Sequence, residues 1–142
     1  MKKIEKLIRI NKNDYVEFDE SVGVTPQQLG GIIPQGYIRY IWFAYFSVLD
    51  AFNPNMGERR VNIILAGNDP NLLGLPVIAH FETTDNDLSD IQGGDIESPI
   101  YVVRPDYSDP NDPKNKVYAS DFYGNATNGK GGLLIAYYDL KE

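Results

Sequence analysis

One segment carries the spacing of a nucleotide-binding loop. Residues 124–131 read GNATNGKG and match the first seven positions of the phosphate-binding pattern G-x-x-x-x-G-K. The eighth position holds Gly131, where the pattern needs a Ser or Thr hydroxyl for Mg²⁺. A β-like run follows, instead of a helix whose first amides could cradle phosphate. We therefore interpret Lys130 as the tip of a hairpin and favour this interpretation over a phosphate site.

The chain has few residues in patterns that indicate acid–base or nucleophilic catalysis. His80 is the single histidine and stands in the middle of PVIAHFETT, with no nucleophile elbow elsewhere. The 20 Asp and Glu residues show no spacing that selects a pair for glycoside hydrolysis. We interpret His80 as a half-buried or interface residue and predict no catalytic residue and no enzymatic activity. A hydrolase without a sequence signature stays open as a third hypothesis.

Two acidic segments could hold calcium through carboxylates spaced two residues apart. The first departs from the EF-hand pattern at three positions, and Asp and Asn are also the common residues of turns. We favour turn chemistry and predict that folding requires no metal or cofactor. A calcium ion held by either segment, with Asp85, Asp87 and Asp90 as the named ligands of the first, is the alternative. The residues concerned are Asp85, Asp87, Asp90 and Asp95 in the first segment, and Asp106, Asp109, Asn111 and Asp112 in the second.

Composition limits the partners and the compartment. The chain has no cysteine, which excludes disulfides, thiolate metal sites and a thiol nucleophile. The net charge of −7 argues against a nucleic-acid binder, except through a basic N-terminal arm that carries Lys2, Lys3, Lys6, Arg9 and Lys12. No apolar run has the pattern of a signal peptide or the length of a membrane span. We therefore expect a soluble protein made in the cytoplasm.

The elements that must position these residues are mostly strands. Ten Tyr, six Phe, 13 Gly and 9 Pro, with Asn and Asp between the apolar runs, favour a sheet protein over a helical one. Residues 3–10 read as a strand or arm, although a helix competes there, and residues 25–29 have the capping pattern of one helical turn. We predict one β-sandwich domain over residues 1–142, with an N-terminal arm of about 14 residues. Strands are expected at residues 15–18, 37–49, 59–66, 76–84, 99–104, 116–123 and 133–140, with a loop at 85–95.

The most apolar segment, residues 37–49, has no polar face. Alternate side chains of a strand point to opposite faces, and here both sets are apolar and aromatic. A sandwich core covers only one face of such a strand, so the other must meet a neighbouring chain or a loop such as residues 19–36. We therefore predict an oligomer interface on this strand, made by Tyr40, Ile41, Trp42, Phe43, Tyr45 and Phe46.

The runs YIRYIWFAYFSVL and, after a glycine-rich turn, LLIAYYDL sit among about eight strands with long Asn/Asp/Pro/Gly loops. In architecture, residues 37–140 resemble the single jelly-roll structural proteins of virions, including phage vertex, minor capsid and head-decoration proteins; trimeric heads of the tumour-necrosis-factor type fit the same features. The resemblance implies an all-β, jelly-roll-like antiparallel sandwich and a non-enzymatic structural subunit that forms homo-oligomers and meets other structural proteins. Its location would be a virion assembled in the host cytoplasm. The alternative is a carbohydrate- or receptor-binding sandwich that acts through its loops.

Overall fold

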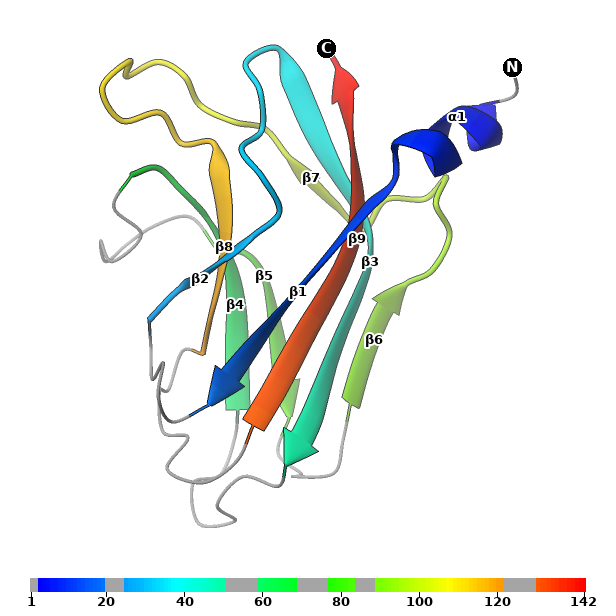
Figure 1. Cartoon of the computed structure of the whole chain (residues 1–142), viewed down its shortest axis with the longest axis vertical. Helices are drawn as coiled ribbons and strands as arrows, with labels where there is room; N and C mark the ends of the chain where they lie inside the picture. Colours follow the sequence, from blue (N-terminus) through cyan, green and yellow to red (C-terminus); the bar gives the residue numbers. More distant parts are fainter. Residues whose placement is uncertain (1–2, 20–24, 51–58, 69–76, 84–88, 122–129) are drawn as a thin grey trace.

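Strands dominate the chain, as the composition predicts, and they form two antiparallel sheets. The computed structural model describes residues 3–19, 25–50, 59–68, 77–83, 89–121 and 130–142. Figure 1 shows the two sheets face to face. The short helix lies at the same end of the molecule as the C-terminus. The elements of the described part are α1 (Lys3–Ile10), β1 (Lys12–Asp19), β2 (Gln27–Leu29), β3 (Tyr37–Asp50), β4 (Arg59–Ala66), β5 (Val77–Thr83), β6 (Ser89–Gly93), β7 (Tyr101–Val103), β8 (Lys116–Asp121) and β9 (Lys130–Lys141).

The strand order defines the fold. One sheet has the order β1-β9-β3-β6, with β7 also paired to β3, and the other has the order β2-β8-β4-β5. Strands β6 and β7 both run antiparallel to β3 and pair with successive parts of it, so they are two halves of one interrupted strand. Counted in this way, the described residues form eight strands, divided between two four-stranded sheets in the order of a jelly roll. The predicted all-β, jelly-roll-like antiparallel sandwich is confirmed.

The core lies between the sheets and is built by alternate residues of the paired strands. Ile41, Phe46, Leu133 and Ile135 face inward from the first sheet, and Ile63 faces them from the second; each is at most 2% exposed. Because antiparallel strands turn every second residue to the same face, the intervening residues of β3 and β9 face outward. We call this outward surface of the β1-β9-β3-β6 sheet the outer face.

A β-bulge changes which residues of β3 face the core. The pairing of β3 with β9 shifts between Ile41 and Phe43, which leaves Trp42 as the extra residue. Before the bulge the odd-numbered Ile41 is inside, whereas after it the even-numbered Ala44 and Phe46 are inside. The predicted alternation along residues 37–49 therefore holds on each side of the bulge but not across it. The bulge places aromatic residues of both parities on the outer face.

Three local predictions are corrected. Residues 3–10 form helix α1, because Ile4, Leu7 and Ile8 fall on one side at helical spacing and Leu7 is buried. Residues 27–29 form strand β2 instead of a helical turn, because pairing with β8 buries Leu29 completely. The expected loop at residues 85–95 contains β6, which pairs with residues 43–47 of β3.

One charged group is buried where β3 meets β9. The Arg39 side chain is sealed from solvent, and it donates hydrogen bonds to both carboxylate oxygens of Asp139, at 2.8 and 3.0 Å. It also donates to the carbonyl oxygen of Gly31 at 2.9 Å and lies 4.2 Å from the centre of the Tyr137 ring. These contacts satisfy the cation and tie the segment before β3 to the first sheet.

Candidate interaction surface

A row of apolar side chains crosses the outer face. Tyr15 of β1 pairs with Leu134 of β9, Leu134 pairs with Tyr45 of β3, and Tyr45 pairs with Ile91 of β6. All four point outward, since their strand neighbours Val16, Leu133 and Phe46 belong to the core or pack against it. Tyr15 is 44% exposed and Ile91 is 61% exposed. We call Tyr15, Leu134, Tyr45 and Ile91 the outer row.

Small residues beside the row let its aromatic rings lie flat on the sheet. A Cβ atom at Gly132 of β9 would come within 2.7 Å of Cε2 of the Tyr15 ring, so this ring occupies the space over the glycine. Phe43 pairs with Gly93 of β6 on one side and with Ala136 of β9 on the other. The Tyr15 ring therefore covers Gly132, and its hydroxyl donates a hydrogen bond to Glu17 at 3.1 Å.

The other end of the outer face is covered from within the chain. The ring of Tyr40 stacks on that of Tyr138 with centroids 5.5 Å apart, and the Tyr138 hydroxyl donates to the carbonyl oxygen of Ile96 at 3.1 Å. Ile96 belongs to the segment 94–100, which interrupts the strand formed by β6 and β7. Burial raises the pKa of the Tyr138 hydroxyl, as expected for a covered phenol.

Helix α1 completes this local cover. Its Leu7 is buried, and the indole nitrogen of Trp42 donates a 2.7 Å hydrogen bond to Oδ1 of Asn11, just after the helix. A groove of about 420 Å³ remains between the helix and segment 94–100, with Ile4, Ile8 and Trp42 among its lining residues. Helix α1 and residues 94–100 thus cover part of the outer face.

The structure separates the six residues predicted for the interface. Tyr40, Trp42, Phe43 and Tyr45 lie on the outer face and are half-buried. Ile41 is fully buried and Phe46 is 2% exposed, both inside the core between the sheets. The prediction is therefore wrong for Ile41 and Phe46, because packing between the two sheets encloses both side chains.

Three outer-row residues were missed from the sequence. Tyr15 and Leu134 lie in predicted strands, but strict alternation in such short segments does not say which face is inside. Ile91 lies in the segment that reads as an acidic loop. Its signal is a single isoleucine flanked by polar residues, which is the pattern of an edge strand with one apolar face.

In the described part of the two acidic segments, the carboxylates accept hydrogen bonds within turns and within strand β6. Asp90 lies in β6, where the amide of Gln92 donates to it at 3.4 Å; Asp85 and Asp87 lie outside the described residues. In the second segment, Asp106 accepts the backbone amide of Ser108 and Asp109 accepts that of Asn111, each at 2.9 Å. The described residues contain no group of three His, Cys, Asp or Glu side chains that could hold a metal ion.

These turn contacts also change the acidity of two side chains. Hydrogen bonds from Ser108 lower the pKa of the Asp106 carboxyl below its ordinary value. The hydrogen bond from Lys114, at 2.5 Å, lowers the pKa of Asp112, which also accepts the backbone amide of Asn68 at 2.8 Å. Both carboxylates therefore stay charged at neutral pH and fix the shape of the connection between β7 and β8.

The two remaining chemical candidates fall in strands. Lys130 begins β9 and its Nζ lies 2.7 Å from Oε2 of Glu17, while Gly131 continues the strand; residues 124–129 lie outside the described part. A strand stands in place of the helix that a phosphate-binding loop needs, which argues against a phosphate site. The interpretation of Lys130 as a hairpin tip is wrong, because β8 and β9 belong to different sheets. The backbone of His80 lies in β5 opposite Asn62, and its side chain lies outside the described residues.

Comparison with known proteins gives structural similarity only. No family model and no curated protein sequence matches the chain. A capsid structure of Helicobacter pylori bacteriophage KHP30 aligns with 94% of this chain and 94% of its own, at 13% identity and a TM-score of 0.40. An expanded particle of the picornavirus equine rhinitis A virus aligns with 100% of this chain and 78% of its own, at 9% identity and a TM-score of 0.41.

A CBM4 structure aligns with 94% of this chain and 96% of its own, at 9% identity and a TM-score of 0.36. The fold is assigned from the chain's own strand order. In the described part, no helix is long and apolar enough to cross a bilayer.

Proposed function

We propose that the protein is a non-enzymatic structural subunit that self-associates through the outer face of the β1-β9-β3-β6 sheet. The outer row carries this proposal, because it extends across all four strands and leaves Ile91 and Tyr15 in contact with solvent. An apolar surface that continues across a whole sheet is costly for a monomer and is typical of a protein interface. Tyrosine suits such a surface, since it buries a large area while its hydroxyl keeps a polar contact.

A second copy of the chain is the simplest partner for this surface. Two sheets pack well face to face when each presents a continuous set of apolar side chains, as the two sheets of this sandwich already do internally. A two-fold contact uses the same patch on both subunits and therefore needs no second complementary surface. The assembly would be of the virion type that the strand order resembles, with this protein as a minor capsid, vertex or decoration subunit and other structural proteins as neighbours.

The experiment compares the solution mass of variants that carry a new charge in or outside the outer face. Ile91→Glu places a carboxylate in the outer row, and its edge position makes the change compatible with folding. We expect Ile91→Glu to dissociate the assembly in sedimentation velocity, while far-UV circular dichroism stays that of a sheet protein. Phe43→Asp should act in the same direction, because Phe43 lies beside the row.

Ile32→Glu is the matched control. Ile32 is 53% exposed, similar to Ile91, but it lies between β2 and β3 and outside the outer face. Its variant should keep the wild-type mass. A wild-type chain that remains monomeric and binds glycans would contradict the proposal and favour the carbohydrate-binding alternative.

A further inference from the structure

A second groove, on the same side of the molecule as α1, carries positive charge. It has a volume of about 470 Å³ and lies where α1 ends, β1 begins and the chain enters β3. Arg9 and Lys12 line it, and no carboxylate of the described residues is within ion-pair distance of either. The remaining lining residues are Ile10, Asn11, Pro34, Tyr37 and Asp139.

The single acid in this lining is already neutralised. Both carboxylate oxygens of Asp139 accept hydrogen bonds from the buried Arg39. The charge that the groove presents is therefore that of Arg9 and Lys12, beside the apolar surfaces of Ile10 and Pro34. Such a surface suits an acidic peptide segment, whose carboxylates can receive charge-assisted hydrogen bonds from both cations.

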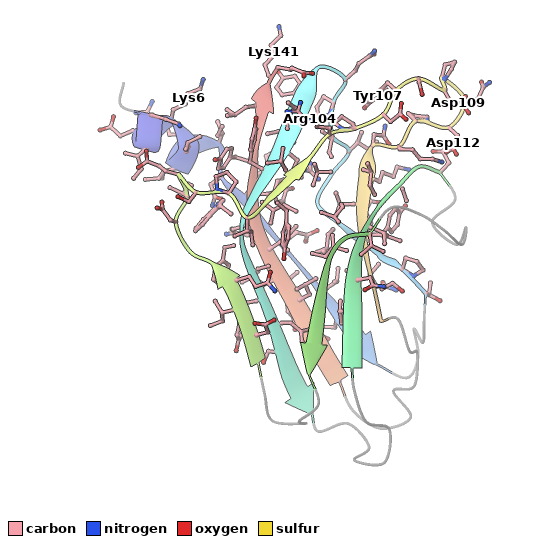
Figure 2. All side chains as sticks on the ribbon, turned by 180° about the vertical axis from the view of Figure 1, so that it is seen from behind. Lys6, Arg104, Tyr107, Asp109, Asp112 and Lys141 are labelled. Carbon is pink, nitrogen blue, oxygen red and sulfur yellow. The ribbon has the colours of Figure 1, made fainter. Side chains whose placement is uncertain are left out.

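The same chain exposes an acidic segment in the connection between β7 and β8, where the Tyr107 hydroxyl donates a hydrogen bond to the carbonyl oxygen of Ile33. Asp106 and Asp109 are exposed, and each is held in a turn by the backbone amide that it accepts. Figure 2 shows Lys6 of α1 at one flank of the molecule and Asp109 with Asp112 at the other. Within one subunit, no carboxylate of this segment lies within ion-pair distance of Arg9 or Lys12, so those of a second copy can meet the two cations.

We propose that the groove lined by Arg9 and Lys12 in one copy receives the segment 105–112 of a second copy. The inference rests on the self-association proposed above and adds a second, polar contact of the head-to-tail type. Such a contact uses two different surfaces of the subunit, so it leads to rings or extended arrays. Because the turns already fix Asp106 and Asp109, docking costs less conformational entropy than ordering a disordered tail would.

Nucleic acid is the competing occupant of a basic groove. The formal net charge of −7 opposes binding of a long polyanion, whereas the two exposed carboxylates of Asp106 and Asp109 match two cations locally. The acidic segment also belongs to the same molecule and is therefore present at equal concentration in any assembly. These observations favour the second copy.

The experiment measures binding of a fluorescein-labelled peptide with the sequence of residues 105–112 to the full-length chain by fluorescence polarisation. We expect saturable binding that weakens at least about tenfold when NaCl rises from about 50 to about 500 mM, because screening removes most of the attraction. The double variant Arg9→Glu/Lys12→Glu should lose this binding at least about tenfold. The same variant should instead bind a peptide with Asp106→Lys and Asp109→Lys, which reverses the charge on both sides.

Lys6→Glu is the matched control, because Lys6 lies on the same helix but does not line the groove. It should leave peptide binding within about twofold of wild type, since an exposed charge outside the groove contributes little. Equal loss in Lys6→Glu would overturn the proposal, because the attraction would then be diffuse. Tighter binding of a deoxythymidine octamer than of the peptide would also overturn it. Ile91→Glu should bind the peptide as the wild type does, which separates this proposal from association through the outer face.

Discussion

An Asp139→Ala substitution would remove the carboxylate that receives two hydrogen bonds from the buried Arg39. Arg39 is 1% exposed. Without Asp139, its guanidinium would keep only the hydrogen bond to the Gly31 carbonyl, at 2.9 Å, and the contact with the face of the Tyr137 ring. Breaking a buried ion pair on one side costs about 3–5 kcal/mol, because the remaining charge is left uncompensated. Asp139 is itself 17% exposed, so water can reach the vacated space and the lower end, about 3 kcal/mol, is expected.

Urea denaturation followed by tryptophan fluorescence measures this loss. For a domain of this size the dependence on urea is about 1.5 kcal/mol per molar, so the midpoint should fall by about 2 M. The double variant Arg39→Met/Asp139→Leu is the control, because it removes both charges and should stay within about 1 kcal/mol of wild type. A loss below about 0.5 kcal/mol in Asp139→Ala would refute the reasoning, since the arginine would then be satisfied without its carboxylate.

Three further predictions concern the backbone, metal ions and alkaline pH. Gly30→Ala should destabilise the fold by about 1–2 kcal/mol in the same assay, because Gly30 has a φ of +72° and a Cβ would lie 2.8 Å from the Tyr137 hydroxyl. Thermal melting should be unchanged by EDTA; a fall of many degrees would mean that an acidic segment holds structural calcium. Burial raises the pKa of Tyr101 and Tyr118 above the ordinary 10.0, so the folded chain keeps protons that the unfolded chain releases. Stability should therefore be constant up to pH 10.0 and fall above it, which denaturation midpoints at about pH 9 and about pH 11 would check; a higher midpoint at the upper pH would contradict this sign.

Much of the sandwich could be predicted from residue types. The apolar run of residues 37–49 and the run RRVNIILA became β3 and β4 with nearly the predicted bounds, because β-branched and aromatic residues fill both strands. Strict alternation along residues 37–49 could not predict which residues face the core beyond Trp42, because the bulge shifts the alternation there by one residue. A bulge depends on how β3 pairs with β9, and that pairing joins residues about one hundred positions apart.

The other differences also come from tertiary contacts. Leu29 is buried because Gln27–Leu29 pairs with β8, and this outweighs the local capping pattern of Thr25 and Pro26. Ile91 belongs to an edge strand that a run of acids and glycines conceals in the sequence. Arg39 reads as an isolated charge in an apolar run, and only the register that places it opposite Asp139 explains its burial.

The solution mass of the wild-type chain over a range of micromolar concentrations tests the central claim most directly. Association through the outer face predicts a mass that is a multiple of 16.0 kDa and that returns to 16.0 kDa in Ile91→Glu but not in Ile32→Glu. A wild-type mass of 16.0 kDa at every concentration would contradict it, because the outer row would then face water in the native protein.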